Sequence, residues 1–173
     1  KPIAVLVDFS FLFAKKDRIF SELWTKNKVD SIMGGWEYIE PALFGVATGK
    51  VIESFNAFFI QPNQQTLAHF HEWMTGAGVL YLENTVPHIS TVFITHATFT
   101  GRALSGSGQP FYSRFDTHNG DQAAKDFHVT AQHSLEKSSA ITANAFTTVS
   151  NNTARECQQL LGKAVDMVTT NGF

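Results

Sequence analysis

Hydrophobic residues fall along the chain in short runs that alternate between strand-like and helix-like periods. The first run, residues 3–8 (IAVLVD), holds five consecutive apolar residues and stops at Asp8. A short run rich in Val and Ile favours extended structure, and its continuity is typical of a strand covered on both faces. We therefore predict that this run is the central strand of a parallel sheet. Asp8 would then lie at the carboxyl end of the strand, where open α/β sheets bind ligands.

The remainder of the first half predicts a helix, a loop and a strand-helix-strand unit. Apolar and charged residues mix with a helical period over residues 13–27. Residues 29–49 hold four glycines and a proline, which predicts a loop with one or two short helices. A strand over residues 51–60, a helix over residues 64–75 and a strand over residues 79–82 follow. Two glycines just after this helix supply its stop, and the short connections predict parallel pairing.

The second half predicts three strands and two helices around a long loop. In chain order they are a strand at 88–99, a surface loop at 101–120, a helix at 121–137, a strand at 145–150, a helix at 153–161 that Gly162 ends, and a strand at 164–169. Loops of about 20 residues exceed the usual connection length and are often functional. Residues 121–169 also fit one long Ala-rich helical hairpin, which leaves a mainly helical structural or surface-coating protein as an alternative.

The composition is that of an ordinary globular protein. The 173 residues are 43% hydrophobic and 16% charged, which suits one domain over residues 1–173. A formal net charge of −2 excludes a global basic field that would draw the chain to nucleic acid or an anionic membrane. The single cysteine, Cys157, excludes an internal disulfide and fits a reducing, cytoplasmic or organellar compartment. No apolar run reaches the roughly 18 residues that span a bilayer, so no membrane partner is expected.

Three short pieces of the sequence resemble the NYN branch of the PIN-like nucleases. They are the opening run with Asp8, residues 120–126 (GDQAAKD) with their two aspartates, and residues 146–152 (FTTVSNN) followed by a helix, a glycine and a strand. The resemblance implies an α/β fold of three layers, with a mostly parallel central sheet flanked by helices. It also implies a carboxylate cluster that binds Mg²⁺ or Mn²⁺ for RNA hydrolysis.

The matching carboxylates are Asp8, Asp121 and Asp126, to which the resemblance assigns catalytic and metal-binding roles. Hydrolysis with two metal ions needs several converging carboxylates, because Mg²⁺ and Mn²⁺ take hard oxygen ligands. The alternative interpretation is that Asp8 and Asp121 cap helices and that Asp126 is solvated, since aspartate is a common N-cap.

The sequence also departs from the nuclease pattern. Phe11 stands where the family usually has asparagine, and Asn152 and Ala154 stand where it usually has an acidic pair. Asn152 could still offer a neutral carbonyl oxygen to a metal, or it could simply be a turn residue. These departures indicate a weakened or inactive site.

Basic residues follow Asp8 and recur in the predicted long loop among aromatic residues. They are Lys15, Lys16, Arg102 and Arg114. Such cations can track an RNA backbone while aromatic rings stack on unpaired bases, so they are candidate contacts to single-stranded RNA. A solvated loop with one aromatic anchor explains the same pattern.

Histidine and cysteine suggest two other chemistries. His69 and His71 would share a face on a strand, but they lie in the predicted helix over residues 64–75, where such positions diverge, and this disfavours a zinc site. No nucleophile-elbow motif surrounds any serine, and Cys157 lies on an apolar helix face, which argues against a serine or cysteine catalyst.

Two hypotheses follow from the resemblance. The first is a metal-dependent ribonuclease, or a catalytically reduced relative of one, that binds single-stranded RNA. The second is a non-enzymatic scaffold or structural subunit of a ribonucleoprotein complex, with protein partners.

Overall fold

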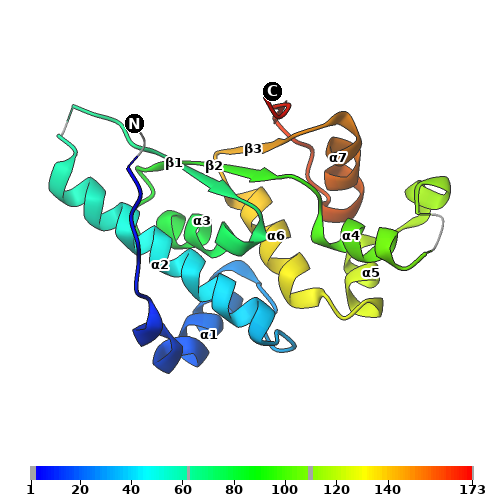
Figure 1. The fold of residues 1–173 in the computed structure, drawn as a ribbon, viewed down its shortest axis with the longest axis horizontal. Helices are drawn as coiled ribbons and strands as arrows, with labels where there is room; N and C mark the ends of the chain where they lie inside the picture. Colours follow the sequence, from blue (N-terminus) through cyan, green and yellow to red (C-terminus); the bar gives the residue numbers. More distant parts are fainter. Residues whose placement is uncertain (1–2, 62, 109–110, 173) are drawn as a thin grey trace.

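A parallel sheet forms one side of the structure (Figure 1). The computed structural model describes residues 3–61, 63–108 and 111–172. Among these residues the sheet has four strands, in the order β1 (Leu67–His71), β2 (Ser90–Thr95), β3 (Ala145–Thr148) and β4 (Met167–Val168). All three pairings are parallel, with Phe70 opposite Phe93 and Phe93 opposite Phe146. This α/β class, with a parallel sheet flanked by helices, confirms the predicted fold class.

Helices connect the strands and build two further layers. They are η1 (Ser10–Lys15), α1 (Lys16–Asn27), α2 (Trp36–Phe59), α3 (Trp73–Thr85), α4 (Phe99–Gly106), η2 (Tyr112–Thr117), α5 (Gly120–Asp126), α6 (Thr130–Thr142), α7 (Asn151–Glu156) and η3 (Cys157–Leu161). Helices α3 and α6 pack beneath the sheet, and α2 packs along α3, with α1 beyond it (Figure 1). The carboxyl ends of β1, β2 and β3 therefore lead into α3, α4 and α7.

Two apolar clusters hold these layers together. Between the sheet and the helices, Phe93 and Phe146 stack with ring centroids 5.9 Å apart, and both are fully buried. Between the helical layers, Tyr38 stacks on Trp73 at 6.0 Å. Aromatic rings bury large apolar areas, so these contacts account for much of the abundant phenylalanine.

The opening run of the chain does not form the predicted central strand. Residues 3–8 are extended but belong to no strand, and Ile3 and Leu6 are 91% and 98% exposed. The prediction was wrong because an apolar run becomes a strand only where a partner strand supplies hydrogen bonds. In the described structure the sheet ends at β1, and residues 3–8 pair with none of its strands.

The predicted strand-helix-strand unit is present, but its elements are exchanged. Residues 51–60 belong mostly to the long helix α2, residues 67–71 are strand β1, and residues 79–82 lie within α3. Gly76 and Gly78, which the sequence pattern places at the end of a helix, lie inside α3. They serve close packing there, since a Cβ on Gly78 would lie 2.5 Å from Phe70 and 2.8 Å from the Gly45 carbonyl oxygen.

In the second half of the chain, the observed elements agree better with those predicted from the sequence. Strands β2, β3 and β4 lie within predicted strands, and Gly162 ends η3 in the left-handed region. The predicted helix over residues 121–137 is broken into α5 and α6, with His128 at φ 57 between them. The predicted long loop holds most of α4 and all of η2. A helical hairpin over residues 121–169 is wrong, because β3 and β4 lie within it.

Within the described residues, no helix is both long enough and apolar enough to cross a bilayer.

Candidate site at the carboxyl edge of the sheet

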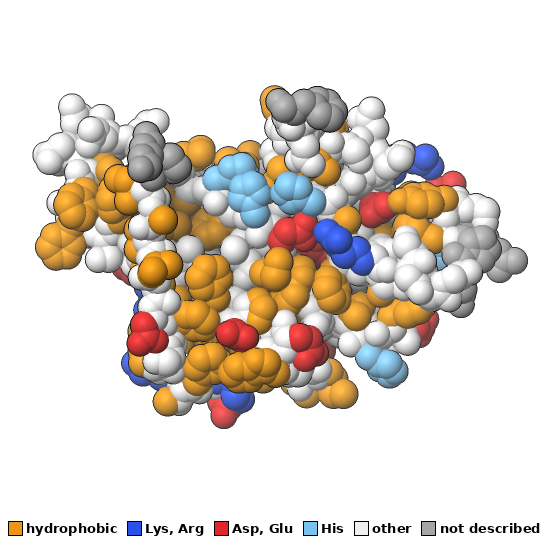
Figure 2. All heavy atoms as spheres, viewed as in Figure 1, with side chains coloured by type: hydrophobic (Ala, Val, Ile, Leu, Met, Phe, Trp, Pro, Cys, Tyr) orange, Lys and Arg blue, Asp and Glu red, His pale blue; other side chains and the backbone are white. Residues whose placement is uncertain are grey.

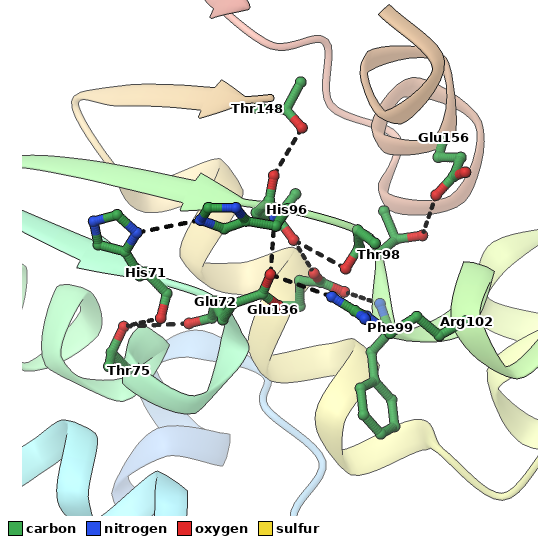
Figure 3. A network of polar contacts seen from close by, with 12 residues as sticks. His71, Glu72, Thr75, His96, Thr98, Phe99, Arg102, Glu136, Thr148 and Glu156 are labelled. Carbon is green, nitrogen blue, oxygen red and sulfur yellow. Dashed lines mark hydrogen bonds and ion pairs between the residues drawn. The ribbon is translucent and has the colours of Figure 1, made fainter. Parts of the chain in front are cut away.

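Polar side chains converge where β1 and β2 end. His71 is the last residue of β1 and Glu72 follows it, while His96 follows β2 directly. Figure 3 shows these residues close together, with Arg102 reaching toward them from α4. On the surface, histidine, acidic and basic side chains meet beside apolar ones (Figure 2). Ligands of open α/β sheets bind at this edge, so the cluster is the candidate site.

Glu72 ties the two strand ends together. Its backbone lies at φ 63 and ψ 161, a region that non-glycine residues rarely adopt, and its amide donates to the Ile94 carbonyl at 2.8 Å. Its carboxylate accepts the His96 amide at 2.9 Å and lies 3.5 Å from the Arg102 guanidinium. Such strain persists only where surrounding contacts enforce it, and it occurs often at functional sites.

Arg102 is the exposed cation of this cluster. Its side chain is 56% exposed, against 17% for the Glu72 carboxylate that it approaches. A single long contact to a half-exposed guanidinium is weak, because solvent screens it. Arg102 therefore keeps most of its hydrogen-bond donors available to a ligand.

Histidines line the face of the sheet next to Arg102. His71 Nδ1 lies 3.3 Å from His96 Nε2, and the His69 and His71 rings are 4.4 Å apart. Burial lowers the pKa of His71, and His69 and His96 lower it further, with Glu72 opposing them. The His71 imidazole is therefore neutral at neutral pH, and in this state it has one donor and one acceptor nitrogen.

Glu136 fixes the loop between β2 and α4 from below. This fully buried carboxyl group on α6 accepts the Thr95 hydroxyl at 2.6 Å and the Phe99 amide at 2.9 Å. Burial raises its pKa to about 7, although both hydrogen bonds and Arg102 oppose the shift. The loop that carries His96 is thus held by a group that titrates near neutral pH.

Glu156 fixes the start of α4 from the other side. It accepts the Thr98 hydroxyl at 3.2 Å and the Tyr112 hydroxyl at 2.7 Å, and the latter hydrogen bond raises the pKa of Tyr112. Thr98 in turn caps α4, since its hydroxyl oxygen accepts the Gly101 amide at 3.1 Å. The N-terminus of α4, with its partial positive charge, therefore has a fixed place beside Arg102.

The aspartates predicted to hold a metal are dispersed. Asp8 is exposed and accepts the Ser10 amide at 2.9 Å, which lowers its pKa. Asp121 binds His133 and Lys137, and Asp126 accepts from Gln122 at 2.8 Å.

Asn152, the predicted neutral ligand, lies exposed in the first turn of α7, whose cap is Ser150. Among the described residues no three His, Cys, Asp or Glu side chains gather to hold a metal ion. The structure therefore does not fit the expected Mg²⁺ or Mn²⁺ site.

The predicted RNA-contacting cations also lie apart. Lys15 lies over the Phe11 ring at 5.4 Å, and Lys16 pairs with Asp17. Arg114 belongs to η2, but its side chain lies outside what the structure describes. Of these cations, the structure brings Arg102 into the candidate site.

Sequence reasoning missed most of this site. Its members are His71, Glu72, His96, Glu136 and Glu156. The signal that could have found His71 and Glu72 is the alternation of His69 and His71 on a strand, followed by a carboxylate. The helix assigned to residues 64–75 hid this pattern.

The parallel sheet, with a polar cluster at its carboxyl edge, defines an α/β protein of the open-sheet class. The family model described as glycogen synthase matches residues 1–173, so the chain belongs to the glycogen synthase family.

Individual relatives agree with this assignment. The chain is 34% identical over 140 residues to the glycogen [starch] synthase of Dictyostelium discoideum, covering 81% of this chain and 16% of that protein. It is 31% identical over 172 residues to the human liver enzyme and 30% identical over 172 residues to that of Caenorhabditis elegans, each match covering 99% of this chain. These matches cover 24% and 26% of the two relatives, so the chain spans about a quarter of their length or less.

The family assignment corrects the nuclease resemblance. The three matching pieces were short, and two of them consist of a strand or helix boundary with an aspartate, which many α/β proteins share. The ribonuclease, its reduced RNA-binding relative and single-stranded RNA as partner were therefore wrong. The ribonucleoprotein scaffold and the helical coating protein are equally unsupported by the relatives.

Proposed function

We propose that this chain contributes the nucleotide-sugar side of a glycosyl-transfer site in a glycogen or starch synthase. The observation that carries the proposal is the half-exposed Arg102 guanidinium beside His71 and His96, at the carboxyl edge of β1 and β2. The family relationship supplies the reaction class, and the geometry of this edge supplies the residues.

Charge explains why a nucleotide sugar suits this edge. Its diphosphate is an anion, and Arg102 offers forked donors that match phosphate oxygens. The neutral imidazole of His71 offers a donor and an acceptor, which suits hydroxyl groups of a sugar or ribose.

The reaction makes the diphosphate more negative as it leaves. The bond between the anomeric carbon and the phosphate oxygen breaks, a bond to a hydroxyl oxygen of the glucan forms, and the proton of that hydroxyl passes to solvent. A cation at the departing diphosphate stabilises the transition state more than the ground state. In this proposal Arg102 has that role, and Glu72 and Glu136 hold the backbone around it.

Replacing Arg102 by glutamine in the full-length protein that carries this sequence tests the proposal. Because charged hydrogen bonds are worth about 1.5–3 kcal/mol, we expect Arg102→Gln to reduce kcat/KM for UDP-glucose or ADP-glucose roughly 10- to 100-fold. The matched control is Arg18→Gln on α1, an exposed arginine with a comparable long contact, 3.8 Å, to Glu22. Equal activity in the Arg102 variant, the Arg18 variant and the parent protein would rule out the proposed role.

A further inference from the structure

A break between two helices places a carboxylate against a buried histidine. The chain between α5 and α6 passes through His128 in the left-handed region, so α6 folds back against α5. Asp121 at the start of α5 thereby lies 2.9 Å from His133 Nε2. On one continuous helix these residues would be about 18 Å apart along the axis, at 1.5 Å per residue. The break is what creates the contact.

The same histidine reaches the helix that carries Arg102. His133 is 2% exposed, Thr100 on α4 is fully buried, and the Thr100 hydroxyl lies 2.9 Å from His133 Nδ1. Thr100 lies in the first turn of α4, two residues before Arg102. The contacts therefore form a chain from α5, through α6, to the helix at the candidate site.

The direction of these hydrogen bonds follows from charge. Asp121 and Lys137 are the charged groups that face His133, from α5 and from α6 itself. Burial tends to raise the pKa of Asp121, but Lys137 and His133 together lower it, so the carboxylate is ionised and only accepts. His133 Nε2 must then donate to Asp121.

The other imidazole nitrogen is fixed as a consequence. Burial lowers the pKa of His133 despite the opposing effect of Asp121, so its ring is neutral at neutral pH and Nδ1 carries no proton. Nδ1 therefore accepts the Thr100 hydroxyl. The nucleotide-sugar site proposed above uses none of these four residues.

We propose that His133, oriented by Asp121 and Lys137, is a positioning residue that holds the first turn of α4 through Thr100 and so aims Arg102 at the diphosphate of the donor. This inference rests on the proposed function. It adds a residue that acts through Arg102 and touches neither substrate nor reacting atoms. Lys137 holds Asp121 with two contacts of 2.8 Å, which keeps the carboxylate directed at His133.

The test compares Thr100→Val with Thr100→Ser in the full-length protein. Valine keeps the shape of threonine but removes the donor, whereas serine keeps the hydroxyl. A lost hydrogen bond of ordinary strength predicts a roughly three- to tenfold fall in kcat/KM for UDP-glucose in Thr100→Val, carried mainly by kcat because Arg102 acts chiefly in the transition state, and parent-like values in Thr100→Ser. Ser105→Ala, an exposed change on the same helix, is the control and leaves both constants unchanged.

A second comparison separates positioning from general damage. If Thr100 acts through Arg102, Thr100→Val has almost no further effect on kcat/KM in the Arg102→Gln background, because the interaction that it supports is already lost. Equal and additive losses in both backgrounds, or a kcat loss that follows a lowered Tm, would overturn the inference. His133→Phe, which fills similar space but removes the Nδ1 acceptor of the Thr100 hydroxyl, is the second variant should Thr100→Val fail to fold, and the same non-additivity is expected.

The two proposals fail in different ways. An unchanged Arg102→Gln enzyme removes the proposed function and the inference with it. A strong Arg102→Gln defect combined with parent-like Thr100→Val leaves the proposed function standing and overturns only the role of His133.

Discussion

At the scale of single residues, the candidate site depends on side chains held in unusual states. Glu136 is fully buried with a pKa raised to about 7, and Glu72 occupies a backbone region that favours glycine. Both groups hold the loop that carries His96, through Phe99 and through the His96 amide. Each of these states costs folding free energy, which the remainder of the structure offsets.

The raised pKa of Glu136 predicts a specific dependence of stability on pH. This carboxyl titrates near pH 4.5 in the unfolded chain and near pH 7 in the folded chain. Its contribution to the stability of the fold is therefore complete below pH 4.5 and is lost as the pH rises through 7. Glu136→Gln cannot ionise. The parent should therefore lose about 3 kcal/mol of unfolding free energy between pH 4 and pH 8 that the Glu136→Gln variant keeps.

Urea denaturation across that pH range measures this difference. Glu22→Gln, an exposed substitution on α1, controls for the loss of one carboxylate elsewhere. Parallel stability curves for Glu136→Gln and the parent would show that the buried carboxyl does not titrate as described.

The sequence revealed some of these residues and hid others. Arg102 was identified as a cation for a phosphate-bearing ligand, and the structure places it in the candidate site, although the RNA partner was wrong. Glu72, Glu136 and Glu156 lie on three different elements, and no local pattern connects them. Only the tertiary fold brings them to one edge of the sheet.

At the scale of elements, two glycines have a different structural role from the one that their sequence positions predict. The sequence places Gly76 and Gly78 after an apparent helix, yet both lie inside α3. Their lack of a Cβ lets α3 approach β1, α2 and α6, and this benefit exceeds the intrinsic helix penalty of about 1 kcal/mol per glycine. A sequence pattern cannot distinguish such a packing glycine from a helix stop.

Alanine substitutions distinguish these two roles of glycine. At Gly78 a Cβ would meet the Phe70 ring at 2.5 Å and a backbone carbonyl at 2.8 Å, so Gly78→Ala should destabilise the fold by about 1–3 kcal/mol. At Gly106, which ends α4, a Cβ would have no neighbour within 4 Å. Gly106→Ala should therefore be neutral or stabilising by up to about 1 kcal/mol.

Thermal unfolding of both variants provides the measurement. A smaller loss for Gly78→Ala than for Gly106→Ala would contradict the close packing of α3 against β1. The positions lie in separate parts of the fold, so their effects should also add in the double variant.

At the scale of the whole molecule, the parallel sheet flanked by helices agrees with the predicted α/β class, while the apolar surface was not anticipated. Beyond Ile3 and Leu6, the carboxyl-terminal end of α2 exposes Phe55, Phe58 and Phe59. Apolar side chains are visible at that end of the molecule in Figure 2. Contiguous exposed apolar residues of this kind promote association.

We expect this chain, produced alone, to self-associate through the aromatic end of α2. The double substitution Phe58→Ser and Phe59→Ser removes two rings that are 83% and 67% exposed, so it should lower the mean mass in sedimentation experiments with little change in Tm. Tyr112→Ser near the candidate site, with a ring of similar exposure (61%), is the comparison. An unchanged mass in the α2 variant would locate the association elsewhere.

The order of the sheet also bears on how the chain is made. Strands β1 to β4 lie side by side in the order in which they are synthesised, and every pairing joins neighbours in that order. Among the strands of the described residues, a ribosome therefore delivers each new one to the growing edge of the sheet, and none of these four has to enter between two strands already paired. The amino-terminal strands can begin to assemble while the carboxyl-terminal ones are still in the exit tunnel.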